Sequence, residues 1–255
     1  MKKDIAVTVR ENVPVAENIY KMTLFSEELP KDIGAGQFLN LSVGDSSHLL
    51  RRPLGIMAHT QNTVTVCYQV KGEGTQMLAQ KEAGDQLTCL LPLGNGFVLD
   101  ESAKKVAVIG GGVGIFPLIS VLNAYRGQKN FVSYIGFRNL AATCMLDELS
   151  ACDKLTISTD DGSYGKKGNA VQAFLADYET EMPDEIIACG PPVMLRVLKA
   201  ELSARKIDTH CLVSLEERMG CGIGACLVCV CKTTDGKNAR VCKNGPVFDI
   251  REVEL

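Results

Sequence analysis

The sequence predicts an antiparallel β barrel, then a doubly wound α/β domain, then a small cysteine-rich domain. Up to about residue 100, short runs rich in β-branched residues alternate partly and are separated by turn residues, as in barrels and sandwiches. Strands and helices then alternate strictly, which indicates a parallel sheet covered on both faces. The final segment carries five cysteines and little helical pattern. We expect domain boundaries at 1–100, 101–215 and 216–255.

Each predicted element is a compact apolar or amphipathic run bounded by turn residues. In the barrel, the strands cover 5–9, 20–25, 38–43, 63–70 and 87–91, with one helical turn at 76–81. In the α/β domain, strands at 105–109, 130–135, 154–158, 185–189 and 209–215 alternate with helices at 115–125, 144–151, 170–178 and 193–205.

Charge and composition exclude several classes of function. With 27 basic and 30 acidic residues the formal charge is −3, so nucleic acid or an anionic membrane is a poor main partner. The uncharged run 106–125 could span a bilayer, but its glycines and Pro117 favour a buried strand, a turn and a helix start. The first residues contain no apolar core of a secretory signal. We expect a reduced, cytoplasmic protein.

The strongest motif is a cysteine cluster near the C-terminus. Cys221-x4-Cys226-x2-Cys229, followed after twelve intervening residues by Cys242, has the spacing of plant-type [2Fe–2S] ferredoxins. Three thiolates on one tight loop converge on a small anionic cluster, and the interleaved glycines let backbone N–H groups face the sulfurs. Cys231 does not fit the spacing, because the required next cysteine would replace Thr234.

Two other interpretations of the cluster are weaker. Zinc favours two Cys-x2-Cys knuckles, and Cys242 has no second cysteine near it. Disulfides need an oxidising compartment, and the total of 11 cysteines is odd. The cysteines outside the motif are interpreted as small buried hydrophobic residues, apart from Cys189. They are Cys67, Cys89, Cys144, Cys152, Cys211 and Cys231.

A glycine-rich turn follows the first parallel strand, where helix N–H groups favour a pyrophosphate. Its candidate cofactor-binding residues are Gly110, Gly111, Gly112 and Gly114. The turn departs from GxGxxG, because Pro117 occupies the third position.

Two further strand ends carry candidate residues. Asp160 and Asp161 follow the third parallel strand, where a carboxylate meets a ribose hydroxyl or caps the next turn. Cys189 and Gly190 end the fourth strand. Ligands of doubly wound sheets bind at the carboxyl ends of strands, so the Cys189 thiol is expected to touch a nicotinamide.

Further motifs link these parts to a family. Arg51-Arg52-Pro53-Leu54-Gly55, Gly72-Glu-Gly-Thr75, Pro92-Leu-Gly-Asn-Gly96 and Glu217-Arg-Met-Gly-Cys221 occur in the order seen in the ferredoxin-NADP⁺ reductase superfamily. Over nearly its full length, the chain resembles the electron-transfer subunits of type B dihydroorotate dehydrogenases.

The resemblance implies FAD as a cofactor and gives roles to residues of the barrel. Arg52 corresponds to the arginine that meets the FAD pyrophosphate, beside Arg51. Pro53, Leu54 and Gly55 replace an aromatic and a hydroxyl residue, so backbone contacts would hold the flavin. The other implied cofactor-binding residues are Tyr68, Gln69 and Val70 beside the flavin, and Gly74 and Thr75 at a phosphate.

The resemblance also implies a function and a partner. FAD would exchange a hydride with NAD(H) and pass single electrons through the [2Fe–2S] cluster. The partner would be an FMN-containing subunit that oxidises dihydroorotate in pyrimidine synthesis, in a heterotetramer of two such pairs. Met219, Ile223 and Leu227 are expected to form an apolar rim for that partner. No pair of basic residues is placed to bind a 2′-phosphate, which favours NAD over NADP. Arg138, after the second strand of the α/β domain, is the residue that could instead favour NADP.

Two alternatives belong to other classes. One is an NAD(P)H diaphorase subunit of another redox complex, of hydrogenase or sulfide dehydrogenase type. The other is a zinc-stabilised, non-enzymatic binding module on a degenerate reductase fold.

Overall fold

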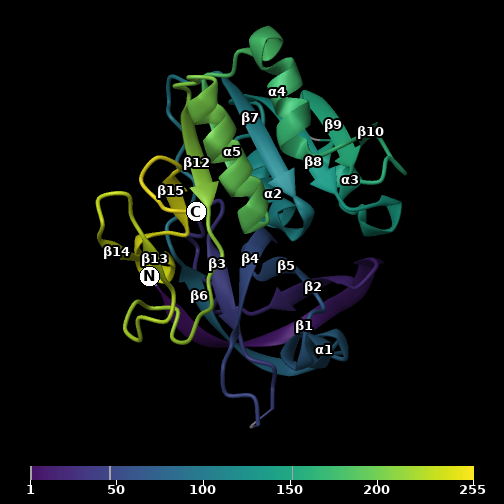
Figure 1. Cartoon of the computed structure of the whole chain (residues 1–255). Coiled ribbons are helices and arrows are strands. Elements are labelled where there is room, and N and C mark those ends of the chain that lie inside the picture. Colours follow the sequence, from purple (N-terminus) through teal and green to yellow (C-terminus); the bar gives the residue numbers. More distant parts are fainter. Residues whose placement is uncertain (1, 46, 151) are drawn as a thin grey trace.

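The computed structural model describes residues 2–45, 47–150 and 152–255, and its N-terminal part is the predicted antiparallel barrel. The strands close in the order β1-β2-β5-β4-β3-β6, in the lower half of Figure 1. Their bounds are β1 (Lys3–Ala16), β2 (Ile19–Phe25), β3 (Phe38–Leu41), β4 (Arg52–His59), β5 (Thr63–Gln69) and β6 (Gln86–Leu93). Helix α1 (Glu73–Ala79) covers one end and starts three residues before the predicted turn.

The sequence analysis missed β4 as a strand. It contains Pro53 and Gly55, which weaken a strand pattern, because proline cannot donate to a ladder. Strand β4 nevertheless pairs with both β3 and β5, so the Arg-Pro-Leu-Gly motif is part of the barrel wall. The pairing places Pro53 opposite Asn40.

The second part is the predicted doubly wound sheet, in the upper half of Figure 1. Its order is β10-β9-β8-β7-β11-β12-β15. The strands are β7 (Lys105–Gly111), β8 (Asn130–Phe137), β9 (Lys154–Thr159), β10 (Lys166–Lys167), β11 (Glu185–Cys189), β12 (His210–Ser214) and β15 (Val247–Asp249). The helices are η1 (Gly112–Gly114), α2 (Ile115–Ala124), η2 (Leu140–Ala142), α3 (Leu146–Leu149), α4 (Ala170–Glu181) and α5 (Pro192–Ala204).

Alternate residues of β7 enter two different apolar cores. Val106 and Val108 pack with α2, whereas Ala107 and Ile109 pack with α4 and α5. Because successive strand side chains point to opposite faces, this division requires helices on both sides of the sheet. The core under α2 also includes barrel residues such as Met57, so α2 lies between sheet and barrel.

Helix α3 is shorter than the predicted helix 144–151. Met145 adopts a left-handed backbone conformation with φ of 56°, which is incompatible with a continuing right-handed helix, and α3 therefore begins at Leu146. Ala151, the last residue of the predicted helix, lies outside the described residues.

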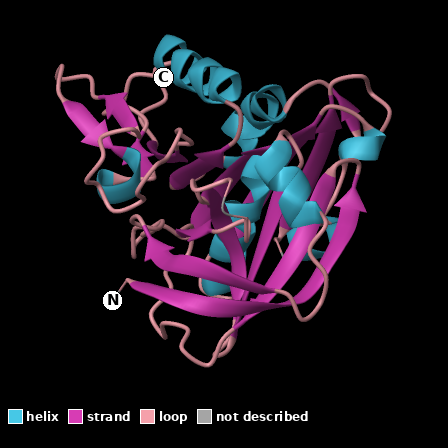
Figure 2. Ribbon diagram, turned by 90° about the horizontal axis from the view of Figure 1, so that it is seen from below, coloured by secondary structure: helices cyan, strands magenta, loops and turns pink. Residues whose placement is uncertain are grey.

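The C-terminal part packs on both other parts. It contains β13 (Val230–Lys232), β14 (Asn238–Arg240), α6 (Val241–Asn244) and β15. Strand β15 joins the sheet antiparallel to β12, a pairing that the sequence analysis did not predict. In Figure 2 the small β13–β14 sheet lies at one edge of the molecule.

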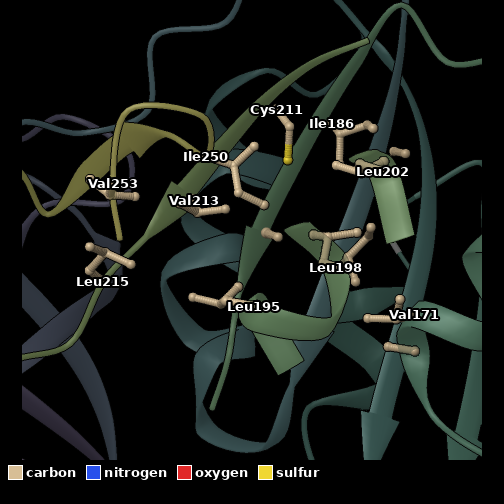
Figure 3. Packing of buried hydrophobic residues seen from close by; sticks show 14 of the residues in the cluster. Val171, Ile186, Leu195, Leu198, Leu202, Cys211, Val213, Leu215, Ile250 and Val253 are labelled. Atoms are coloured by element: carbon tan, nitrogen blue, oxygen red, sulfur yellow. The ribbon is translucent and has the colours of Figure 1, made fainter. Parts of the chain in front are cut away.

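One apolar core joins the C-terminal part to the sheet. Figure 3 shows Ile250 and Val253 beside Val213 of β12, with Leu195 and Leu198 of α5 approaching the same strand. The barrel contributes to this core through Phe38 and Leu93. Burial of these side chains therefore fixes the three parts against one another.

Among the described residues, no helix is long and apolar enough to cross a membrane. The uncharged run 106–125 forms most of β7, η1 and α2, as its glycines predicted.

The close approach of two turns gives a testable prediction. A Cβ added to Gly114 would lie 2.5 Å from the backbone carbonyl carbon and oxygen of Cys189. Gly114→Ala must therefore shift backbone, and we expect it to lower the free energy of unfolding by about 1–3 kcal/mol in denaturant titrations. Gly72→Ala is the matched control, because nothing lies within 4 Å of the added Cβ and φ is −164°. Equal stability of the two variants would contradict this packing.

Candidate functional site

A cavity of about 240 Å³, here called the barrel cavity, lies where the three parts meet. The barrel lines it with Pro53, Leu54 and Gly55 of β4 and with Tyr68 and Gln69 of β5. Other lining residues come from α2 and the strand ends beyond it, and include Phe116, Pro117, Cys189, Ser214, Glu216 and Met219. The antiparallel pairing of β4 with β5 brings two separate sequence motifs onto one wall.

Arg52 and α1 form a basic corner beside this wall. A Cβ at Gly74 would lie 2.1 Å from Arg52 Nη2, so only glycine lets the guanidinium lie against the start of α1. Arg52 Nη1 donates to the Leu50 carbonyl at 2.6 Å, a neutral partner. The Thr75 hydroxyl accepts hydrogen bonds from the backbone N–H groups of Lys71 and Gly72 and lines the cavity. The corner combines a fork of donors with a helix start, which suits phosphate oxygens.

The structure places Arg51 apart from this corner. Its guanidinium makes a bidentate pair with Asp4, at 2.8 and 3.0 Å, and also donates to Thr88 Oγ1. Arg51 precedes β4, and its guanidinium faces Asp4 of β1, whereas the guanidinium of Arg52 faces Gly74 of α1. The geometry therefore gives Arg51 a structural ion pair on the barrel surface, where the sequence analysis had expected cofactor contact.

Tyr68 is held rigidly in the cavity wall. Its ring stacks on Tyr20 with centroids 5.9 Å apart, and its hydroxyl donates to Asn12 Oδ1 at 3.0 Å. Burial raises the pKa of Tyr68, so the phenol stays neutral. Val70 follows β5 and is half-buried against the barrel core.

The opposite side of the cavity is formed by the carboxyl ends of β11 and β12. Cys189 is 2 % exposed, and burial raises the pKa of its thiol, so the thiol is uncharged. Glu216 lines the same cavity. The surrounding protein raises the pKa of its carboxyl, and the positive charge of Lys71 acts in the opposite direction. Glu216 was not predicted as a site residue from the sequence. Its position directly after the last predicted strand, 209–215, is the one feature of the sequence that indicates a place near the site.

A second cavity of about 770 Å³, here called the sheet cavity, lies at the carboxyl edge of β7, β8 and β9. Gly111 and Gly112 line it, and a Cβ at Gly112 would meet nothing within 4 Å, so this turn is open to a ligand. Gln69, Lys71 and Val113 line both cavities, so the two cavities are adjacent. A dinucleotide at the turn could therefore reach the barrel wall.

The other glycines of the two turns serve close packing. A Cβ at Gly110 would clash with Ile135, and one at Gly190 would lie 3.1 Å from the Gly111 Cα. Together with the Gly114 contact, these approaches bring the Cys189–Gly190 turn against the glycine-rich turn.

The two aspartates at the end of β9 have different surroundings. Asp160 lines the sheet cavity, together with Arg138 from the end of β8. Asp161 accepts from the backbone N–H and hydroxyl of Ser163 at 2.9 and 2.6 Å, and these bonds lower the pKa of its carboxyl. Asp161 therefore caps the turn, which was the structural alternative for this residue, and Asp160 is the carboxylate available to a ligand.

The four motif cysteines form two pairs. Cys221 donates its backbone N–H to Cys226 Sγ at 3.3 Å, and Cys226 returns its N–H to Cys221 Sγ at 3.4 Å. Cys242 donates its backbone N–H to Cys229 Sγ at 3.4 Å. A [2Fe–2S] cluster takes two thiolates on each iron, and this pairing suits that division.

Backbone donors prepare Cys221 for a metal. Burial opposes ionisation of its thiol, but the N–H groups of Cys226, Ile223 and Ala225 outweigh burial and lower its pKa to about 6. Burial and the neighbouring Cys229 raise the pKa of Cys242 to about 12, so that thiol needs a cation to ionise.

Within residues 2–45, 47–150 and 152–255, no three His, Cys, Asp or Glu side chains converge as one ion requires. The surplus Cys231 is buried in the apolar core, which agrees with its predicted packing role. The other predicted packing cysteines are also buried, except for the half-buried Cys152.

Comparison with known proteins identifies relatives over the whole chain. Residues 216–254 match the family described as the iron-sulfur cluster binding domain of dihydroorotate dehydrogenase B. The dihydroorotate dehydrogenase B (NAD(+)) electron transfer subunit of Streptococcus thermophilus is 38% identical, with 97% of each chain covered. The subunit of the same name from Bacillus velezensis is 39% identical, over 99% of this chain and all of the relative.

Solved structures support the same fold. An NADH-dependent reduced ferredoxin-NADP oxidoreductase, studied for flavin-based electron bifurcation, has a TM-score of 0.87 and 25% identity, covering 97% of this chain and 89% of its own. Phthalate dioxygenase reductase has a TM-score of 0.65 at 20% identity, covering 98% and 77% respectively, and shows the shared fold.

The barrel, the doubly wound sheet and the paired cysteines define a ferredoxin-NADP reductase-like oxidoreductase component with an iron–sulfur segment. Within that class, the full-length similarity is to one group of relatives. The chain belongs to the family of dihydroorotate dehydrogenase B electron transfer subunits.

The two neighbouring arginines allow a matched test of the basic corner. Arg52→Ala removes charged donors beside Gly74, and we expect FAD affinity to fall by roughly 10- to 100-fold, measured by flavin fluorescence titration. Arg51→Ala breaks an exposed ion pair and should leave FAD affinity unchanged, with a stability change of about 1 kcal/mol or less. The reverse order of effects would contradict the placement of the two side chains.

The cysteine pairs allow a second test. Cys221→Ser removes one sulfur of the first pair, and we expect protein-bound iron and sulfide to fall close to zero, with loss of the visible iron–sulfur absorption. Cys231→Ser should keep full iron content, because that sulfur packs in the apolar core. Iron loss in Cys231→Ser with retention in Cys221→Ser would assign the ligands differently.

Proposed function

We propose that this chain is the electron transfer subunit of an NAD-dependent dihydroorotate dehydrogenase B. It would pass electrons from the FMN of a catalytic partner subunit, which oxidises dihydroorotate in de novo pyrimidine (UMP) biosynthesis, to NAD⁺. Full-length similarity to subunits of this name supports the assignment. The observation that carries it in the structure is the barrel cavity, which adjoins both a nucleotide-sized cavity and the cysteine loop.

The residues of the barrel cavity suit FAD. Bound FAD would supply hydride exchange with NAD(H) and single-electron exchange with a [2Fe–2S] cluster. Backbone of Pro53–Gly55 and the rigid Tyr68 would hold the ring, while Arg52 and the start of α1 would hold the pyrophosphate. The uncharged Cys189 lines the cavity from the sheet side, where it would orient the nicotinamide without adding charge.

The residues of the sheet cavity suit a nicotinamide dinucleotide. Gly111 and Gly112 would receive its pyrophosphate, and Asp160 would accept from a ribose hydroxyl. A carboxylate at that position favours NAD over NADP, because it repels the 2′-phosphate of NADP. Arg138, which lines the same cavity, carries the opposite charge. Lys71 and Gln69 at the boundary would guide the nicotinamide toward the barrel wall.

The cysteine loop would connect the flavin to the partner. Met219 lines the barrel cavity two residues before Cys221, and Phe38 of the cavity shares an apolar core with Cys229 and Cys242. The protein between the two cofactor positions is therefore packed and apolar. On the outer side, the side chains of Ile223 and Leu227 are 49% and 61% exposed.

These exposed residues would form the partner interface. Val228, at 53%, extends the apolar rim, which suits a packed protein contact. The half-buried Met219 faces the barrel cavity and is not part of the exposed rim. We place the complex, a heterotetramer of two pairs, in the cytoplasm, and take 1–100, 101–215 and 216–255 as the three domains.

Spectroscopy and kinetics together test this function. The purified chain should show flavin bands and an iron–sulfur shoulder, and NADH should reduce the flavin more efficiently than NADPH. With the FMN catalytic subunit added, dihydroorotate should drive NAD⁺ reduction. A protein with neither chromophore, or a complex without dihydroorotate-dependent turnover, would refute the proposal.

The apolar rim gives a specific prediction. Ile223→Glu places a carboxylate in the interface without a partner charge, and we expect binding to the FMN subunit to weaken at least about tenfold by calorimetric titration. Met182→Glu is the control, because Met182 is 69% exposed at the end of α4. Equal binding of both variants would place the interface elsewhere.

A further inference from the structure

Asn40 is a buried polar residue that the proposed function does not use. It lies on β3 and is 1% exposed, and no described residue forms a hydrogen bond with either its Nδ2 or its Oδ1. A buried amide without partners is unfavourable, so an acceptor is expected beside its Nδ2 group.

The position of Asn40 indicates what that acceptor is. Strand alternation sends Leu39 and Leu41 into the barrel core, whereas Phe38 and Asn40 point outward to the C-terminal part. A Cβ added to Gly222 would lie 2.7 Å from Asn40 Nδ2, so the amide nitrogen faces the cysteine loop between Cys221 and Ile223.

Asn40 also adjoins the flavin wall. Its Cα is paired with that of Pro53, which lines the barrel cavity, and Leu93 packs against the same face of Gly222. The amide therefore stands between the flavin position and the cluster loop, in apolar surroundings that strengthen a hydrogen bond.

We propose that the Asn40 side-chain amide donates a hydrogen bond to a sulfur of the [2Fe–2S] cluster on its Cys221 side and thereby raises the reduction potential of the cluster. The physical basis is charge: reduction adds an electron to an anionic cluster, and a donor to sulfur stabilises the reduced form. The inference rests on the proposed function, because it requires the cluster.

The test measures the cluster potential by redox titration followed by electron paramagnetic resonance. Asn40→Leu keeps the branched outline of the side chain and its number of heavy atoms but removes the donor, so the midpoint should shift in the negative direction. Asn40→Asp replaces the donor by a carboxylate and should shift it further in that direction. Ser133→Ala is the control, because Ser133 Oγ is also buried and has no hydrogen-bond partner among the described residues, but lies on β8, outside the cysteine loop.

A second readout separates this role from a purely structural one. After chelation of iron, full-length Asn40→Leu should unfold at a temperature no lower than the unsubstituted chain treated alike, because no protein group is left unpaired. Unchanged midpoints in both Asn40 variants, or a marked loss of stability of iron-free Asn40→Leu, would overturn the inference. Absence of any [2Fe–2S] signal in the unsubstituted chain would instead refute the proposed function.

Discussion

The contact between the barrel wall and the C-terminal segment is the constraint on which the site depends. The side chains of Phe38 and Leu93 pack outside the barrel, in an apolar core that also contains Cys229 and Cys242. The same core includes side chains from the face of the parallel sheet that α4 and α5 cover. Because interiors are packed at nearly crystalline density, such a core permits one arrangement of its parts. The barrel cavity exists at the junction of the three parts only while this arrangement holds.

A second constraint acts between two turns far apart in sequence. Gly114 meets the Cys189 backbone, and Gly190 meets Gly111, so the glycine-rich turn and the Cys-Gly turn form one structural unit. Neither turn alone is specific evidence for a nucleotide-binding site. Their contact brings a phosphate-type turn and a buried thiol to one edge of the sheet, where the sheet cavity and the barrel cavity share lining residues.

The order of elements could be predicted because it depends on local periodicity. Strict alternation after Asp100 was sufficient for the doubly wound sheet, and cysteine spacing was sufficient for the cluster motif. Strand β4 was not predicted, because its proline and glycine weaken the sequence pattern of a strand. Pairing with β3 on one side and β5 on the other stabilises it. The different directions of Arg51 and Arg52, and the position of Glu216 in the barrel cavity, depend on tertiary contacts that a single sequence does not encode locally.

The thiols illustrate how the backbone assigns different chemistry to the same side chain. Cys189 lies among apolar neighbours, and burial keeps its thiol protonated. Cys221 receives three backbone N–H groups from a loop that can turn back on itself because Gly222 adopts a φ of +70°. Those donors stabilise the thiolate that a metal requires, whereas burial keeps the Cys189 thiol neutral. The pattern of N–H donors, more than the cysteine count, therefore distinguishes the thiols of the cysteine loop from the buried thiol of the barrel cavity.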